Sequence, residues 1–198
     1  MSFNLLETVQ KDLGYPSLKK VNPNTLDVAA DRESQLPQHN FAQAAIPTTL
    51  IGLYKYSLED AGADNLLRGN ISTSWANALF GTRENEVVEK INQYAGSGID
   101  DTGSKINEIA ADAVKRIREH LKAGSTIKEV KILMADQRNN ILPYLPGVMH
   151  LGNTVNDDTI DDSTTKMEGP VSNLMKAIGN KFSKPITEKD LNDKELNY

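Results

Sequence analysis

The chain has 198 residues, of which 38% are hydrophobic and 25% are charged, and a formal net charge of −5. This is the composition of an ordinary globular chain, long enough for one sizeable core or two small ones. Without cysteine it makes no disulfide, thiolate nucleophile or cysteine-ligated zinc site, and its net negative charge disfavours nucleic acid and anionic membranes as partners.

The N-terminal stretch predicts a short amphipathic helix. Its apolar residues recur at helical spacing: Phe3, Leu6, Val9 and Leu13. Ser2 is a candidate N-cap, and Gly14 ends the helix. A basic start is missing and Glu7 breaks the apolar run, so the stretch is not a signal peptide and we expect a cytoplasmic protein. The polar residues that follow, 15–40, are predicted to form a loop.

The most apolar stretch of the chain follows this loop, around residues 41–56. Its apolar side chains cover more than one helical face, which is typical of a central, buried helix. Pro47 either kinks this helix or lies in the first turn of a new one, and Gly52 would allow another backbone to approach closely. The stretch is shorter than the ~20 residues of a membrane span.

Further helices are predicted along the rest of the chain. A short helix over 72–80 contains Trp75, and a second one over 82–95 ends at a Gly-Ser-Gly turn. A long helix from Asp101 or Thr102 has apolar positions at a 3.6-residue period and is predicted to end at Gly124. The segment 126–129 reads as a capping box that starts the next helix, which runs towards residue 141. A last helix is expected after residue 170, followed by a charged tail, 185–198.

These elements predict an all-α protein, a multi-helix bundle of short helices separated by Gly and Pro. An aliphatic-Pro step occurs twice, at Ile46-Pro47 and at Leu142-Pro143. It indicates two related helical modules, 1–80 and 81–184, although chance would also produce such an echo.

The same residues resemble a known family. The two aliphatic-Pro steps, together with the Ala-rich helical unit EVVEKINQYAGSGIDDTGSKINEIAADAVKRI, are similar to the YidB-like bacterial proteins of unknown function. The resemblance covers about half of the chain. It implies a small, helical, cytoplasmic, bacterial protein and supplies no catalytic residue, and the polar loop and the acidic segment depart from the family pattern.

The acidic segment NDDTIDDSTTKMEG, residues 156–169, is the candidate metal site. In the register of an EF-hand loop, Asp157, Asp161 and Glu168 take positions 1, 5 and 12, which suits calcium or magnesium. Two residues violate the pattern. Thr159 takes position 3, where an acid or an amide is expected, and Asp162 takes position 6, where the sharp turn requires glycine. The competing interpretation is a solvated helix start, in which the acids cap free amides.

Other ionisable residues do not converge in sequence on a catalytic motif. His120 is expected to interact with the C-terminal end of the long helix, and His150 reads as a buried histidine. Asp112 and Arg116 have the spacing of an ion pair on a solvated helix face.

We therefore predict a protein without catalytic residues or a required cofactor that acts through protein–protein contacts, including contacts with a second copy of itself. The apolar segment ILPYLPGVM supplies the candidate interface: Leu142, Tyr144, Leu145, Val148 and Met149. One alternative is a divalent-metal-binding or small-molecule-binding protein that uses residues 157–168. Another is a bundle that holds an apolar ligand in a cavity, lined by Ile46, Leu50, Leu53 and Trp75.

Overall fold

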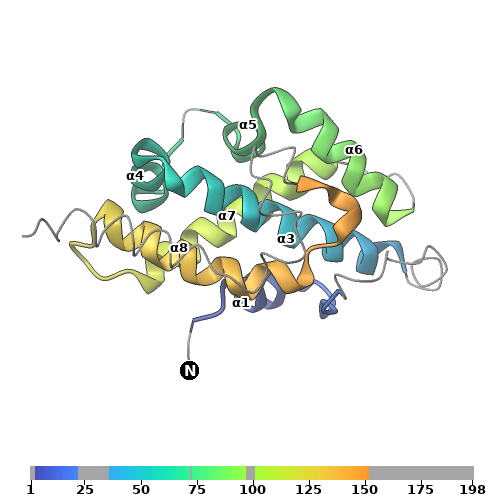
Figure 1. The fold of residues 1–198 in the computed structure, drawn as a ribbon, viewed down its shortest axis with the longest axis horizontal. Helices are drawn as coiled ribbons and strands as arrows, with labels where there is room; N and C mark the ends of the chain where they lie inside the picture. The colour runs from blue at the N-terminus through green and yellow to red at the C-terminus, as the bar shows by residue number, and fades with distance from the viewer. Residues whose placement is uncertain (1–2, 22–35, 72, 97–100, 152–198) are drawn as a thin grey trace, which may run out of the picture. The chain divides into compact units, whose positions relative to one another are not determined.

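The computed structural model describes residues 3–21, 36–71, 73–96 and 101–151, and the regular elements in these ranges are all helical. The helices pack against one another as an all-α multi-helix bundle (Figure 1), which confirms the predicted fold class. The α-helices are α1 Leu5–Asp12, α3 Pro37–Leu58, α4 Asp60–Arg68, α5 Trp75–Phe80, α6 Glu84–Ala95, α7 Thr102–His120 and α8 Ile127–Ile141. Short 3-10 helices cover Gly81–Arg83, Leu142–Tyr144 and Gly147–Met149.

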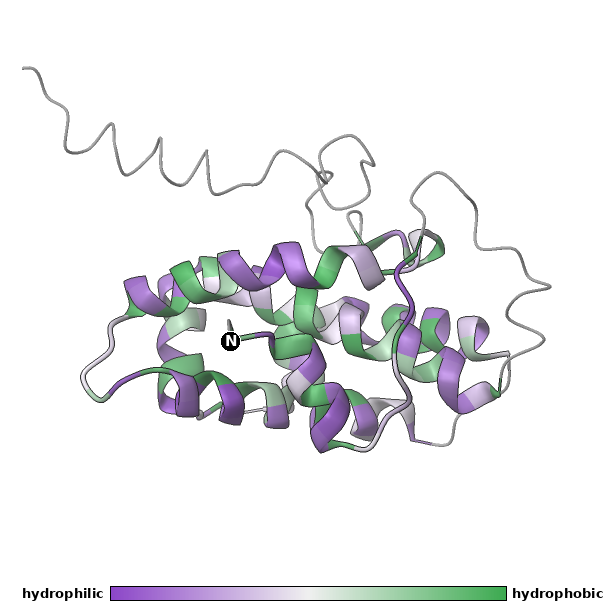
Figure 2. Cartoon of the chain, turned by 90° about the horizontal axis from the view of Figure 1, so that it is seen from below, coloured by the Kyte–Doolittle hydropathy of each residue, from purple (hydrophilic) through white to green (hydrophobic). Residues whose placement is uncertain are grey.

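Helix α3 is the central element of the bundle. Most of its residues are buried, and it packs against α1, α4, α5, α6, α7 and α8. Apolar residues on several faces make this burial favourable, as the sequence predicted. Pro47 lies inside the helix, which is continuous from Pro37 to Leu58, so the alternative of a new helix at Pro47 is wrong. Along most of the surrounding helices, hydrophilic and hydrophobic stretches alternate (Figure 2).

Several helix ends differ from the sequence prediction. Helix α1 is capped by Asn4, whose side-chain oxygen accepts a hydrogen bond from the Glu7 amide at 3.3 Å, so Ser2 is not the cap. Helix α3 begins at Pro37, inside the predicted loop, because proline suits the first turn of a helix. Helix α7 ends at His120, before Gly124. The start of α8 is as predicted, with both bonds of the capping box present.

Two glycines permit close packing around α3. A Cβ atom at Gly52 would lie 3.0 Å from the Phe80 ring, so a side chain of α5 approaches here rather than the backbone that the sequence suggested. A Cβ atom at Gly62 would collide with the carbonyl oxygen of Tyr56. The tight passage from α3 to α4 therefore requires a residue without a side chain.

One hydrophobic core cluster draws side chains from residues on both sides of position 80, including Leu53 of α3, Ile91 of α6, Ile109 of α7 and Met134 of α8. The division into modules 1–80 and 81–184 stays a prediction, and the described parts of both contribute to this one cluster. The helix predicted after residue 170 and the tail 185–198 lie outside the described residues. Among the described helices, none has the length and apolar character that crossing a membrane requires.

Candidate functional site

The acidic segment cannot be placed. Asp157, Asp161 and Glu168 lie outside the described residues. In the ranges that the structure does describe, no group of three or more histidine and carboxylate side chains is arranged to hold a metal ion. The metal-site interpretation and the helix-start interpretation of this segment therefore both stay predictions.

The predicted interface segment is mostly part of the chain's own core. Leu142, Leu145 and Met149 are buried, and Tyr144 and Val148 are half-buried against the core. Pro143 lies in the short 3-10 helix that follows α8, and Pro146 precedes the next one. The segment thus continues in short 3-10 turns whose apolar side chains pack on the core. A second molecule would reach the buried three only if this segment left the core.

Other residues singled out in the sequence have clear positions. The four residues proposed to line an apolar cavity are buried, with Trp75 edge-on to Tyr56 at 6.4 Å between ring centroids. His150 is exposed, with a positive φ of 43°, so the prediction of a buried histidine is wrong. His120 is the last residue of α7, and its expected interaction with the end of this helix stays a prediction.

A site that the sequence did not predict is formed where residues 3–21, here called the N-terminal arm, meet the rest of the bundle. The arm contains α1, which packs against α3, α7 and α8. Its side chains Leu5, Leu6 and Val9 are buried in the common core. The residues that hold the arm, here called the arm-binding residues, are Phe41, Gln43, Arg116, His120 and Gln137.

Gln137 of α8 binds the backbone at the start of the arm. Its side-chain oxygen accepts a hydrogen bond from the Leu5 amide at 2.8 Å, and its side-chain nitrogen donates to the Phe3 carbonyl at 3.1 Å. The first amides of a helix have no partner within the helix, so Gln137 satisfies one of them in a buried position. An unmade bond here would cost the full desolvation of that amide.

Gln43 of α3 binds the other end of the arm in the same way. Its side-chain oxygen accepts from the Lys19 amide at 2.8 Å, and its nitrogen donates to the Lys19 carbonyl at 2.9 Å and to the Tyr144 carbonyl at 2.7 Å. The Val21 amide donates to the Pro143 carbonyl at 2.8 Å. Both ends of the arm are therefore recognised through its backbone, by one buried glutamine at each end.

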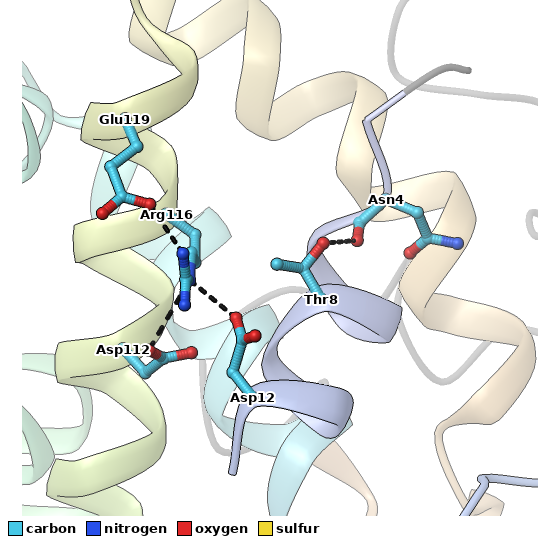
Figure 3. Close-up of polar contacts among 6 residues, drawn as sticks. All are labelled: Asn4, Thr8, Asp12, Asp112, Arg116 and Glu119. Carbon is cyan, nitrogen blue, oxygen red and sulfur yellow. Dashed lines mark hydrogen bonds and ion pairs between the residues drawn. The ribbon is translucent and has the colours of Figure 1, made fainter. Parts of the chain in front are cut away.

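Arg116 of α7 makes the charged contact to the arm (Figure 3). Its Nε lies 2.6 Å from a carboxylate oxygen of Asp12, and its Nη1 donates a hydrogen bond to Glu119 at 2.8 Å. Asp112 is a third carboxylate, 3.8 Å from Nε. The sequence placed the pair of Asp112 and Arg116 on a solvated face, but both side chains are partly buried under the arm, and Asp12 is the closest partner of Nε.

The pKa values of Arg116 and Asp112 in this cluster are both raised, for different reasons. The hydrogen bond to Glu119 raises the pKa of Arg116, and the nearby carboxylates act in the same direction. Burial raises the pKa of Asp112, with help from the charges of Asp12 and Glu119, against the opposing effect of Arg116. One guanidinium is thus shared by three carboxylates, and the least solvated of them holds its charge at a cost.

Ring contacts complete the attachment of the arm. Phe3 stacks on His120 with 4.2 Å between the ring centroids and 9° between the planes. Tyr15 packs on Phe41 at 6.0 Å, and burial raises the pKa of its hydroxyl, with a smaller contribution from Glu108. The arm is consequently held along its length by apolar burial, backbone hydrogen bonds, one ion pair and two ring contacts.

Sequence reasoning missed the two glutamines and the role of Asp12. The available signal was a polar residue inside an apolar run, as for Gln43 within FAQAAI, since a buried amide needs partners. Gln137 stands among polar residues and gave no such signal. The neighbouring Arg138 is also buried, at 1% exposed, and its guanidinium carbon lies 5.9 Å from the centre of the Tyr54 ring.

Comparison with known proteins finds no family model, curated protein or solved structure that matches the chain. The resemblance to the YidB-like family therefore stays a prediction from the sequence.

Proposed function

We propose that the protein acts through protein–protein contacts, without catalysis of its own, and that self-association is the form these contacts take. The observation that carries the proposal is the way the bundle holds its N-terminal arm. An amphipathic helix lies with its apolar side against three other helices, which is also how many proteins bind helical partners.

The contacts at the ends of the arm support this proposal further. Gln43 and Gln137 bind backbone amides and carbonyls of the arm, as a receptor binds the main chain of a peptide. Apolar side chains of α1 supply the buried area between these two points. The bundle thus carries a set of contacts for a short helical segment followed by one without regular secondary structure.

The proposal includes a cytoplasmic location and a bacterial, YidB-like relationship, both of which rest on the sequence. Fractionation of cells that produce the protein tests the first. The structure of a known YidB-like protein tests the family relationship, which predicts the same order of helices around a central helix that corresponds to α3.

The first experiment is a light-scattering measurement of molecular mass over a hundredfold range of protein concentration. Self-association predicts a mass that rises above the 21.8 kDa of one chain as concentration increases. A mass of one chain at every concentration would contradict the proposal.

A further inference from the structure

We propose that two copies of the chain associate by exchanging their N-terminal arms, so that residues 3–21 of each copy bind to the arm-binding residues of the other. This inference rests on the proposed function and names the partner and the surface. Exchange of an identical element is a low-cost route to a dimer, because the interactions that hold an arm within one chain form again between two chains.

The chemistry of the contacts favours a second copy over an unrelated helix. Recognition of the backbone by Gln43 and Gln137 would accept many sequences, but the other contacts are selective. Arg116 pairs with the carboxylate at position 12, and His120 stacks on the ring at position 3. Residues 3–21 of another copy supply both groups, together with the three apolar side chains that the core accepts.

The covalent connection allows the exchange. Residues 22–35 join the arm to Leu36, the first described residue before α3. Fourteen residues reach at most about 50 Å when extended. That reach exceeds the ~30 Å diameter of a small domain, so the length of this connection does not prevent an arm from binding a neighbouring copy while its own α3 remains in place.

The ion pair between Asp12 and Arg116 provides a specific test. In Asp12→Arg, the arm loses its ion pair with Arg116 and brings a second guanidinium next to the first, so that two cations share Asp112 and Glu119. In Arg116→Asp, an arm with Asp12 meets an anion that already has Asp112 and Glu119 beside it. Each single variant therefore weakens the binding of its own arm.

A 1:1 mixture of these two variants restores opposite charges in both halves of an exchanged dimer. In one half, the cation introduced at position 12 of the first variant meets the anion introduced at position 116 of the second. In the other half, the unchanged Asp12 of the second variant meets the unchanged Arg116 of the first. Exchange therefore relieves the repulsion that each variant has when it is alone.

The measurement is the molecular mass of the 1:1 mixture by light scattering, with helix content by circular dichroism. We expect the mixture to contain a species of twice 21.8 kDa that neither variant forms alone to the same extent. The matched control is the double variant Asp12→Arg, Arg116→Asp, in which the pair is restored within one chain. It is expected to associate no more than the wild-type chain does.

The mixing experiment still distinguishes the two outcomes if one of the single variants does not fold on its own. If a variant alone is poorly helical, arm exchange predicts that helix content rises when the two variants are mixed. A mixture whose mass and helix content equal the average of its components would overturn arm exchange. If the wild-type chain still gains mass with concentration in that case, self-association uses another surface, and the proposed function stands without this inference.

Discussion

Helix α3 and the N-terminal arm are attached to the same core by different means. Helix α3 is surrounded by other helices and is buried on most of its faces, largely by apolar side chains. The arm contributes three fully or almost fully buried apolar side chains and packs partly buried ones against the core, and it is also bound by two glutamines, one arginine and two ring contacts. The centre of this fold is therefore specified by hydrophobicity, whereas its N-terminal attachment combines apolar burial with individual polar partners.

The largest expected effect is the loss of stability when an apolar side chain of α3 is shortened. Leu50→Ala removes a fully buried side chain from α3, and we expect the free energy of unfolding to fall by about 2–5 kcal/mol, since a cavity remains. Urea denaturation followed by circular dichroism measures this change. Gln38→Ala, at an exposed position in the first turn of α3, is the control and should change stability little. Equal effects in both variants would contradict the central role of α3.

The second prediction concerns the attachment of the arm. Gln137→Leu keeps a side chain of similar size but leaves the Leu5 amide and the Phe3 carbonyl without partners. We expect a loss of about 1–3 kcal/mol, the usual cost of a buried unsatisfied polar group. Hydrogen exchange of the Leu5 amide should become faster at the same time.

The matched control for this variant is Gln93→Leu, because Gln93 is an exposed helical glutamine whose side chain donates a hydrogen bond to the side chain of Glu89 and binds no part of the arm among the contacts described. It should leave both stability and the exchange of the Leu5 amide nearly unchanged. If Gln137→Leu behaved like Gln93→Leu, the backbone bonds of Gln137 would not be holding the arm.

A third and smaller effect distinguishes the charges under the arm from those elsewhere. The pKa of Asp112 is raised in the folded protein, mainly by burial, so the folded state binds its proton more tightly than the unfolded state. Its contribution to stability therefore falls as pH rises through the interval between the ordinary and the raised pKa. Relative to wild type, Asp112→Asn should become more favourable over this interval and then level off.

Asp60 provides the opposite sign in the same experiment. Its hydrogen bond and ion pair with Lys131, at 2.7 Å, lower its pKa. Its contribution is present above the ordinary pKa and is lost as pH falls through the lowered one, so Asp60→Asn should become relatively less favourable as pH rises. Denaturation of both variants between pH 3 and 7 checks the two signs. Parallel trends would show that the burial of Asp112 does not matter.

The smallest effect concerns the metal-binding alternative, which lies outside both compared regions. If residues 157–168 bind a divalent ion, millimolar calcium or magnesium should raise the melting temperature, because a ligand of the native state stabilises it. The double variant Asp157→Ala, Asp161→Ala should lose this increase. An equal increase in the variant, or none in the wild-type chain, would argue against the acidic site.

The sequence was sufficient for features that depend on local pattern. The 3.6-residue period over α7, the capping box at Thr126 and Glu129 and the burial of α3 all come from neighbouring residues. The contacts of Gln43, Arg116 and Gln137 join residues far apart in the chain, and a glutamine carries no sign of the backbone that it will bind. The pattern of the apolar segment after α8 did not settle whether its side chains are buried, because apolar residues near two prolines suit a surface patch and a core segment equally.

The hydrogen bond between Leu5 and Gln137 also bears on the order of synthesis. Its partners are 132 positions apart, so the ribosome synthesises the arm long before it adds Gln137. Helix α1 has eight residues, and isolated helices shorter than about 12–15 residues are marginal in water. During most of translation the apolar side chains of the arm therefore have no core to enter. Until residue 137 has been synthesised, the arm lacks one of the two glutamines that bind its backbone.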